Sequence, residues 1–167
     1  MQMGQSLSEL KTKVLNKIIN DIELVKAIII NNESFLDITP TPEQNAILQA
    51  PESLIRTQVM PYKNITNETN KDMTYITSGW LNFKKERGMY KSGIVYFYII
   101  VPNQYEKTDQ GIRYDFIADK LDSILSNQNN IGEFQFDERG DISIDTEYLG
   151  HFISFRILDF YGVWYKC

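Results

Sequence analysis

The chain is organised around the run Gly93-Ile94-Val95-Tyr96-Phe97-Tyr98-Ile99-Ile100-Val101, which ends at Pro102. This run is β-branched or aromatic almost throughout, apolar at both alternating sets of positions, and too short to span a membrane. These properties predict a central strand that is buried on both of its faces.

A second helix, at about residues 110–126, is predicted after this strand. Four apolar residues recur at helical spacing in it, while the charged residues lie largely on the other face. The apolar residues are Ile117, Leu121, Ile124 and Leu125. A buried strand followed by an amphipathic helix predicts a sheet with a helix packed across it.

Two helices are predicted in the N-terminal third. Ser6 begins a capping-box sequence, and the apolar residues that follow recur at helical spacing, which predicts one long helix from Leu7 to about Asn31. Thr41-Pro42-Glu43 has the N-cap, proline and acid that are typical of a helix start, and Pro51 would end this short helix.

The remaining strands are predicted from short runs of apolar and β-branched residues. They are Leu54–Met60, Met73–Phe83 with Gly79 as a bulge or bend, a hairpin of Phe134–Phe136 and Ile142–Ile144 with Gly140 in its turn, and His151–Phe160. The order is helix, strands, helix, strands. We therefore expect an α+β fold, in which an antiparallel or mixed β-sheet is packed by a long N-terminal helix and the second helix.

Length and composition indicate one globular domain, residues 1–167, because 43% of the residues are hydrophobic and 23% are charged. The net charge of −5 argues against a dedicated nucleic-acid binder, since phosphate binding requires clustered Lys and Arg. The only cysteine, Cys167, allows no intramolecular disulfide and no cysteine cage for a metal. The N-terminus has no signal-peptide pattern, so we expect a cytoplasmic protein when it is made.

Catalytic patterns are missing from the sequence. His151 is the only histidine, expected to be a polar residue at a strand end, and no serine lies in a Gly-x-Ser-x-Gly elbow. No phosphate-binding glycine motif is present. The carboxylates between Glu133 and Glu147 could bind a hard cation, but they lack the order of a calcium loop, and charge on an exposed hairpin is commonplace. We expect a protein that is not an enzyme, with no cofactor and no metal.

Two charged segments and an aromatic C-terminus are the candidate contact residues. The basic loop contains Lys84, Lys85, Arg87 and Lys91; the acidic hairpin contains Asp137, Glu138, Asp141 and Asp145; the C-terminus contains Trp164 and Tyr165. In a head-to-tail ring each subunit presents two different surfaces, and separated patches of opposite charge would steer and register that contact. The alternative is that both are simply solvated loops.

The chain also resembles a known family in several segments. They are Val59–Lys63, Tyr98–Val101, the loop Lys107–Arg113 that leads into Asp115–Leu121, and the end Asp159–Gly162. Together with the order of elements, these resemble small neck proteins of tailed bacteriophages, and most closely the tail terminators. The segment Phe35–Pro51 departs from that pattern and leaves the neck position open.

The resemblance implies an α+β subunit of a homo-oligomeric ring, usually of six copies, without catalytic residues. Such a ring caps the tail tube and joins it to the head connector, and DNA passes through its lumen without being read. It is found in the virion neck and, during assembly, in the host cytoplasm. The alternative from another class is a small non-enzymatic adaptor that binds a partner protein through exposed aromatic residues.

Overall fold

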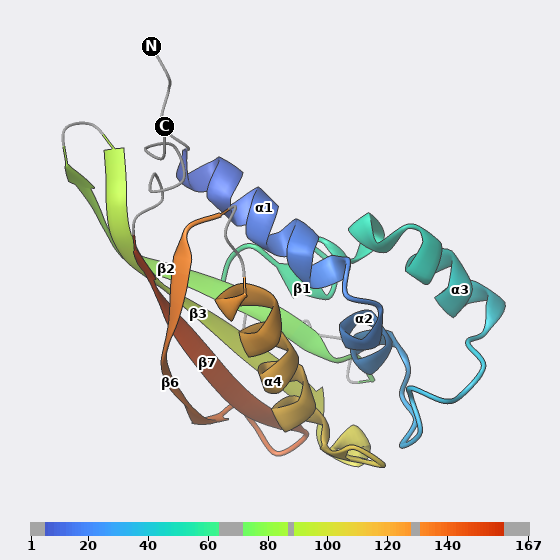
Figure 1. The fold of residues 1–167 in the computed structure, drawn as a ribbon. Helices are drawn as coiled ribbons and strands as arrows, with labels where there is room; N and C mark the ends of the chain where they lie inside the picture. Colours follow the sequence, from blue (N-terminus) through green and yellow to red (C-terminus); the bar gives the residue numbers. More distant parts are fainter. Residues whose placement is uncertain (1–5, 64–71, 87–88, 128–130, 159–167) are drawn as a thin grey trace.

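The computed structural model describes residues 6–63, 72–86, 89–127 and 131–158. Its centre is a five-stranded mixed sheet of order β1-β2-β3-β7-β6, and the helices lie against one face of this sheet (Figure 1). The strands are β1 (Val59–Met60), β2 (Tyr75–Glu86), β3 (Met89–Pro102), β6 (Glu133–Ser143) and β7 (Tyr148–Leu158). The predicted α+β class is confirmed.

The predicted central strand is β3, which pairs antiparallel with β2 on one side and with β7 on the other. Val95, Phe97 and Ile99 are fully buried on the side of the helices. Tyr96 and Tyr98, which point to the opposite face, are only half-buried. The strand is thus covered less completely than predicted, because the helices of the described chain lie on one face of the sheet.

The predicted long N-terminal helix is divided into α1 (Leu7–Ile19) and α2 (Ile22–Ile29). The break falls at Asp21, whose carboxylate accepts a hydrogen bond from the backbone N–H of Leu24 at 2.8 Å and so caps α2. The capping box at Ser6 is present as predicted. Both helices contribute to one core, since α1 contacts α2 and α4 (Arg113–Ser126).

The short helix α3 (Pro42–Gln49) and the second helix α4 are confirmed. In α3, the Thr41 hydroxyl accepts from the N–H of Gln44, whose side chain accepts from the N–H of Thr41. In α4, Ile117, Leu121 and Leu125 are fully buried and face the sheet, as their helical spacing indicates.

Arg113, the first residue of α4, is fully buried and ties three segments together. Its guanidinium donates to the backbone carbonyl oxygens of Tyr105, Ala27, Ile30 and Asn32, at 2.7–2.9 Å. Its carbon Cζ lies 4.9 Å from the centroid of the Phe35 ring. Burial lowers the pKa of Arg113 to about 10. The cation therefore fastens the end of α2, and the chain after it, to the start of α4.

The strand predicted at Leu54–Met60 is shorter than expected. Residues Pro51–Leu54 form a 3₁₀ helix, and β1 follows a turn in which Arg56 has φ +72°. Gly79 is also not a bulge, because it pairs regularly with Tyr96. The register shifts fall between Leu81 and Lys84, where Asn82 has φ +55°, and between Lys84 and Lys85. Backbone conformation at these positions, rather than glycine, sets the bends.

The predicted hairpin around Gly140 is wrong. Residues Glu133–Ser143 form the single edge strand β6, and the hairpin is the one that joins β6 to β7. Gly140 lies opposite Phe152, and a Cβ there would come within 3.2 Å of that ring. The actual turn is held by the Asp145 carboxylate, which accepts from the N–H groups of Glu147 and Tyr148. An edge strand tolerates the polar run that the sequence pattern treated as a turn.

A small second sheet precedes α4. The 3₁₀ helix η2 (Asn103–Tyr105) leads from β3 to β4 (Lys107–Thr108), which pairs antiparallel with β5 (Gly111–Ile112). Gly111 has φ +99°, a conformation that favours glycine. In the part of the chain that the structure describes, no helix has the length and apolar character needed to cross a membrane.

Candidate inter-subunit surfaces

The predicted basic loop is the end of the β2–β3 hairpin. Lys84 is exposed, the backbone of Lys85 pairs with Tyr90, and Lys91 lies in β3, whereas Arg87 lies outside the described residues. This end of the hairpin extends beyond the helices (Figure 1). The basic residues therefore mark a projecting end of the sheet rather than an irregular loop.

Asp137 and Glu138 of β6 have partners on the face of the sheet away from the helices. The Asp137 carboxylate accepts from Arg156 Nε at 2.7 Å, and the Glu138 carboxylate accepts from the Tyr96 hydroxyl at 3.2 Å. These contacts use part of their hydrogen-bonding capacity within the subunit. Glu138 nevertheless stays exposed and available to a second chain.

Asp141 and Asp145 do not share a surface with Asp137 and Glu138. Asp141 lies opposite His151 and contacts its Nδ1 at 3.0 Å, on the side of the helices. Asp145 lies in the β6–β7 turn. Side chains alternate between the faces of a strand, so carboxylates that are close in sequence are distributed over different sides. The structure does not bring the four acids together as one patch.

His151 is 5% exposed and sits inside β7, not at its end. Its Nε2 accepts from Arg139 Nε at 3.2 Å, and its ring stacks on Tyr114 of α4 with 4.9 Å between centroids. Arg139 also binds Asp119, at 2.9 Å, and Asp115 of α4. Arg139 of β6 and His151 of β7 therefore join both strands to α4.

The pKa of Tyr114 is raised by burial first, and then by the charges of Asp141, Asp115 and Glu106, while Arg139 opposes the shift. The sequence pattern indicated no role for Arg139, because its carboxylate partners are 20 or more residues away in α4 and His151 lies on the neighbouring strand. A single arginine in an acidic, polar strand was the only signal available.

The open face of the sheet carries a cluster of half-buried aromatic rings. Tyr96 stacks on Tyr98 with 6.2 Å between centroids and lies 6.1 Å from Phe152. Lys63 Nζ lies 5.1 Å from the centroid of Tyr98. Leu81 of β2, which pairs with Ile94, is 49% exposed. Burial raises the pKa of both tyrosines. We name Tyr96, Tyr98 and Phe152 the aromatic cluster; its signal in the sequence was the alternation of aromatic residues in β3.

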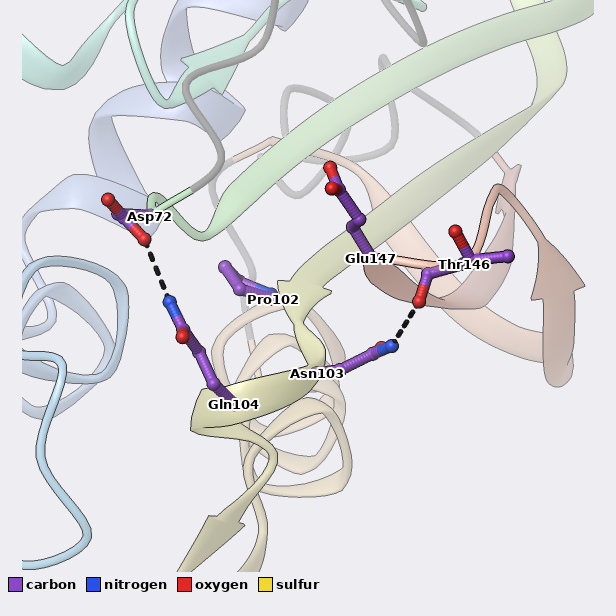
Figure 2. Close-up of a pocket in the computed structure, with 6 residues that line it drawn as sticks. All are labelled: Asp72, Pro102, Asn103, Gln104, Thr146 and Glu147. Atoms are coloured by element: carbon purple, nitrogen blue, oxygen red, sulfur yellow. Dashed lines mark hydrogen bonds between the residues drawn. The ribbon is translucent and has the colours of Figure 1, made fainter.

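A hollow of about 380 Å³, lined mostly by polar residues, lies at the end of the sheet opposite to the turn of the β2–β3 hairpin. Figure 2 shows the residues that line it, and in it Gln104 donates to Asp72 at 2.8 Å and Asn103 donates to the Thr146 carbonyl oxygen at 2.7 Å. The lining residues are Asp72, Pro102, Asn103, Gln104, Thr146 and Glu147. Among the described residues, no three His, Cys, Asp or Glu side chains are grouped to hold a metal.

The two ends of the sheet differ in their charged residues, although Glu133 of β6 lies in the same row across the sheet as Lys84. Lys84 and Lys85 lie at the β2–β3 end, and Asp72, Asp145 and Glu147 lie at the end where β6 turns into β7. Trp164 and Tyr165, the predicted aromatic contacts, lie outside the described residues.

These features define an α+β protein whose candidate sites are surfaces for protein contact. A family model, YomW, matches residues 21–157, so the chain belongs to the YomW family. That membership indicates a phage-associated protein. No curated protein and no solved structure matches the chain.

Proposed function

We propose that this protein is a structural subunit of the phage neck, a tail terminator-like protein that assembles into a homo-oligomeric ring of six copies. The ring caps the tail tube and joins it to the head connector. The observation that carries the proposal is the separation of charged residues in the subunit. Lys84 lies near the outer end of β2, Glu133 lies on the opposite edge of the sheet in β6, and Asp72, Asp145 and Glu147 lie at the other end of the sheet. A head-to-tail ring requires two different surfaces that complement one another.

Two further properties support this function. The phage association of the family agrees with the resemblance of several segments to neck proteins. The net charge of −5 suits a lumen through which DNA slides, because an acidic wall does not retain a polyanion. The role is structural and non-enzymatic, without a cofactor, in the virion and, before that, in the cytoplasm of the host.

A partner-binding adaptor is the second candidate, and the aromatic cluster favours it. Aromatic side chains are enriched at protein interfaces, and these rings lie on a face that the described helices leave uncovered. An adaptor stays monomeric until its partner is added, whereas a ring subunit associates with itself. Stoichiometry in solution therefore separates the two functions.

The experiment that tests the neck function is an early stop codon in the gene for this chain, within the phage that carries it. A tail terminator ends growth of the tail tube, so we expect tails of uncontrolled length and full heads without tails in electron micrographs. Supplying the protein from a plasmid should restore joined virions. Normal virions from the mutant phage would refute the proposal.

A further inference from the structure

Within the part of the chain that the structure describes, the sheet has two edges along which most of the backbone pairs with no further strand. On one edge, β6 has no partner on its outer side among the described residues, along the whole of Glu133–Ser143. On the other edge, β1 pairs with β2 only at Ile76 and Thr77, so residues 78–86 extend beyond it. Unpaired edges of this length are templates for pairing with another chain.

The direction of the strands determines how such a contact would form. From β2 through β3 and β7 to β6, each neighbouring pair is antiparallel. The strands β2 and β6 therefore run in opposite directions. If a second copy is placed beside the first in the same orientation, β6 of one copy lies antiparallel to β2 of the other.

The register of the sheet places complementary side chains at the two edges. Residues that pair on successive strands form rows across the sheet. One row consists of Lys84 in β2, Ser92 in β3, Leu158 in β7 and Glu133 in β6. It therefore has an exposed lysine at the β2 edge and an exposed glutamate at the β6 edge. If the second copy is not displaced along the strand direction relative to the first, Glu133 of one copy lies opposite Lys84 of the next.

A second row runs Trp80, Val95, Phe155, Phe136, on the side of the helices. Phe136 is 50% exposed, although it is a large apolar residue next to the core, and Trp80 is half-buried. The same placement of two copies brings Phe136 beside Trp80 of the neighbour. An aromatic pair and an opposite-charge pair across adjacent strands both stabilise a sheet.

We propose that the sheet continues from copy to copy, with β6 of one subunit paired antiparallel to residues 78–86 of the next. Glu133 lies against Lys84 and Phe136 against Trp80 at each junction. The occupant of each edge is a second copy of this chain. This inference rests on the proposed ring and names the contact that forms it.

The competing arrangement is a two-fold dimer through β6 and β6 of two copies. Between Glu133 and Ser143 the strand carries four carboxylates and one arginine. A two-fold contact would set these carboxylates against one another, and like charges directly opposite destabilise strand pairing. The segment 78–86 contains Lys84 and Lys85 with a single acid, Glu86, so it is the better partner for β6.

Disulfide trapping tests the geometry directly. In a Cys167→Ser background, one preparation carries Glu133→Cys and a second carries Lys84→Cys, since neighbouring antiparallel strands bring Cα atoms within about 5.5 Å, a distance that a disulfide spans. We expect a covalent dimer only when the two preparations are mixed, and a ladder of multimers when one chain carries both cysteines. A third preparation carries Glu138→Cys, near the middle of β6. If the Glu133→Cys or the Glu138→Cys protein forms covalent dimers by itself, β6 pairs with β6 of a second copy, and the proposal is overturned.

Charge exchange provides the matched control for folding. Glu133→Lys and Lys84→Glu should each weaken subunit association about tenfold per contact, because like charges then face each other. The variant with both substitutions restores opposite charges and should recover most of the association. Additive losses in the double variant would overturn the contact.

The two proposals fail in different ways. If rings form but neither trapping nor charge exchange gives the expected result, the ring stands and the β6–β2 contact is wrong. If the ladder forms but the chains never close into a ring, the contact stands and the proposed neck function fails. If neither rings nor ladders form, both proposals are refuted.

Discussion

Replacing the buried Arg113 with methionine should destabilise the fold strongly. Methionine fills a similar space without a charge, and it leaves four backbone carbonyl oxygens without the donors that they now have. Each buried polar group that loses its partner costs about 1–3 kcal/mol. The Ile30 carbonyl keeps a second donor, the N–H of Asn32 at 3.0 Å, so the cost for this carbonyl is at the low end of that range.

Removing the charge also removes the free-energy cost of burying a cation, a cost that is reflected in the lowered pKa of Arg113, about 10. The net loss is then about 4 kcal/mol, a large share of the roughly 5–15 kcal/mol that stabilises a typical protein. At about 2–4 °C for each kcal/mol in a chain of this size, the melting temperature should fall by about 8–16 °C.

Urea denaturation followed by circular dichroism measures this difference in the free energy of unfolding. Arg156→Met is the matched control, since the side chain of that arginine is 63% exposed and forms an ion pair with Asp137 at the surface. The control should lose less than about 1 kcal/mol. An equally small loss in Arg113→Met would refute the inference that this cation fastens α2 to α4.

Three further predictions concern the sheet and a helix start. Gly150→Ala should cost about 1–3 kcal/mol, because the new Cβ would lie 2.8 Å from the Ile142 carbonyl oxygen; an unchanged urea midpoint would contradict this. Thr41→Ala should cost about 1 kcal/mol through loss of the α3 cap, whereas Thr41→Ser should cost less; equal losses would contradict a hydroxyl role. The pKa of Tyr96 is raised above 10.0 by burial first and then by Glu138, so Glu138→Gln should lower it in an ultraviolet titration. The associated stability is present below pH 10 and is lost as the pH rises through the folded-state pKa; an unchanged Tyr96 titration would argue against the hydrogen bond.

Elements with strong apolar periodicity could be predicted from the sequence. The spacing of Ile117, Leu121 and Leu125 indicated α4, and the apolar run of β3 indicated the centre of the sheet. Helix starts were also readable, because Ser6 and Thr41 use local side-chain hydrogen bonds that depend on residues three positions away.

The errors have a common physical origin in exposed or irregular backbone. β6 has an edge exposed to solvent, so its polar residues carried no strand alternation, and Gly140 suggested a turn where Phe152 requires a small neighbour. The break at Asp21 interrupts α1 and α2 without disturbing their apolar spacing. A tertiary contact decided the position of Gly140, whereas a local hydrogen bond from Leu24 to the Asp21 side chain marks the break between the helices.

The sequence suggested single candidate contact residues, but it could not place them on surfaces. Lys84 lies in strand β2 near a projecting end of the sheet, not in the predicted loop, and the acids of β6 alternate between faces. The aromatic cluster and the partners of Arg139 depend on the order of strands, which the sequence did not specify.

The mass of the purified protein in solution tests the central claim most directly. Light scattering across protein concentrations, at low and moderate salt, should give one discrete multimer of six copies that salt weakens. Lys84→Glu should weaken it further, and the control Lys13→Glu, at an exposed position of α1, should not. A monomer at every concentration and both salt levels would contradict the account of a ring that assembles through its own charged edges.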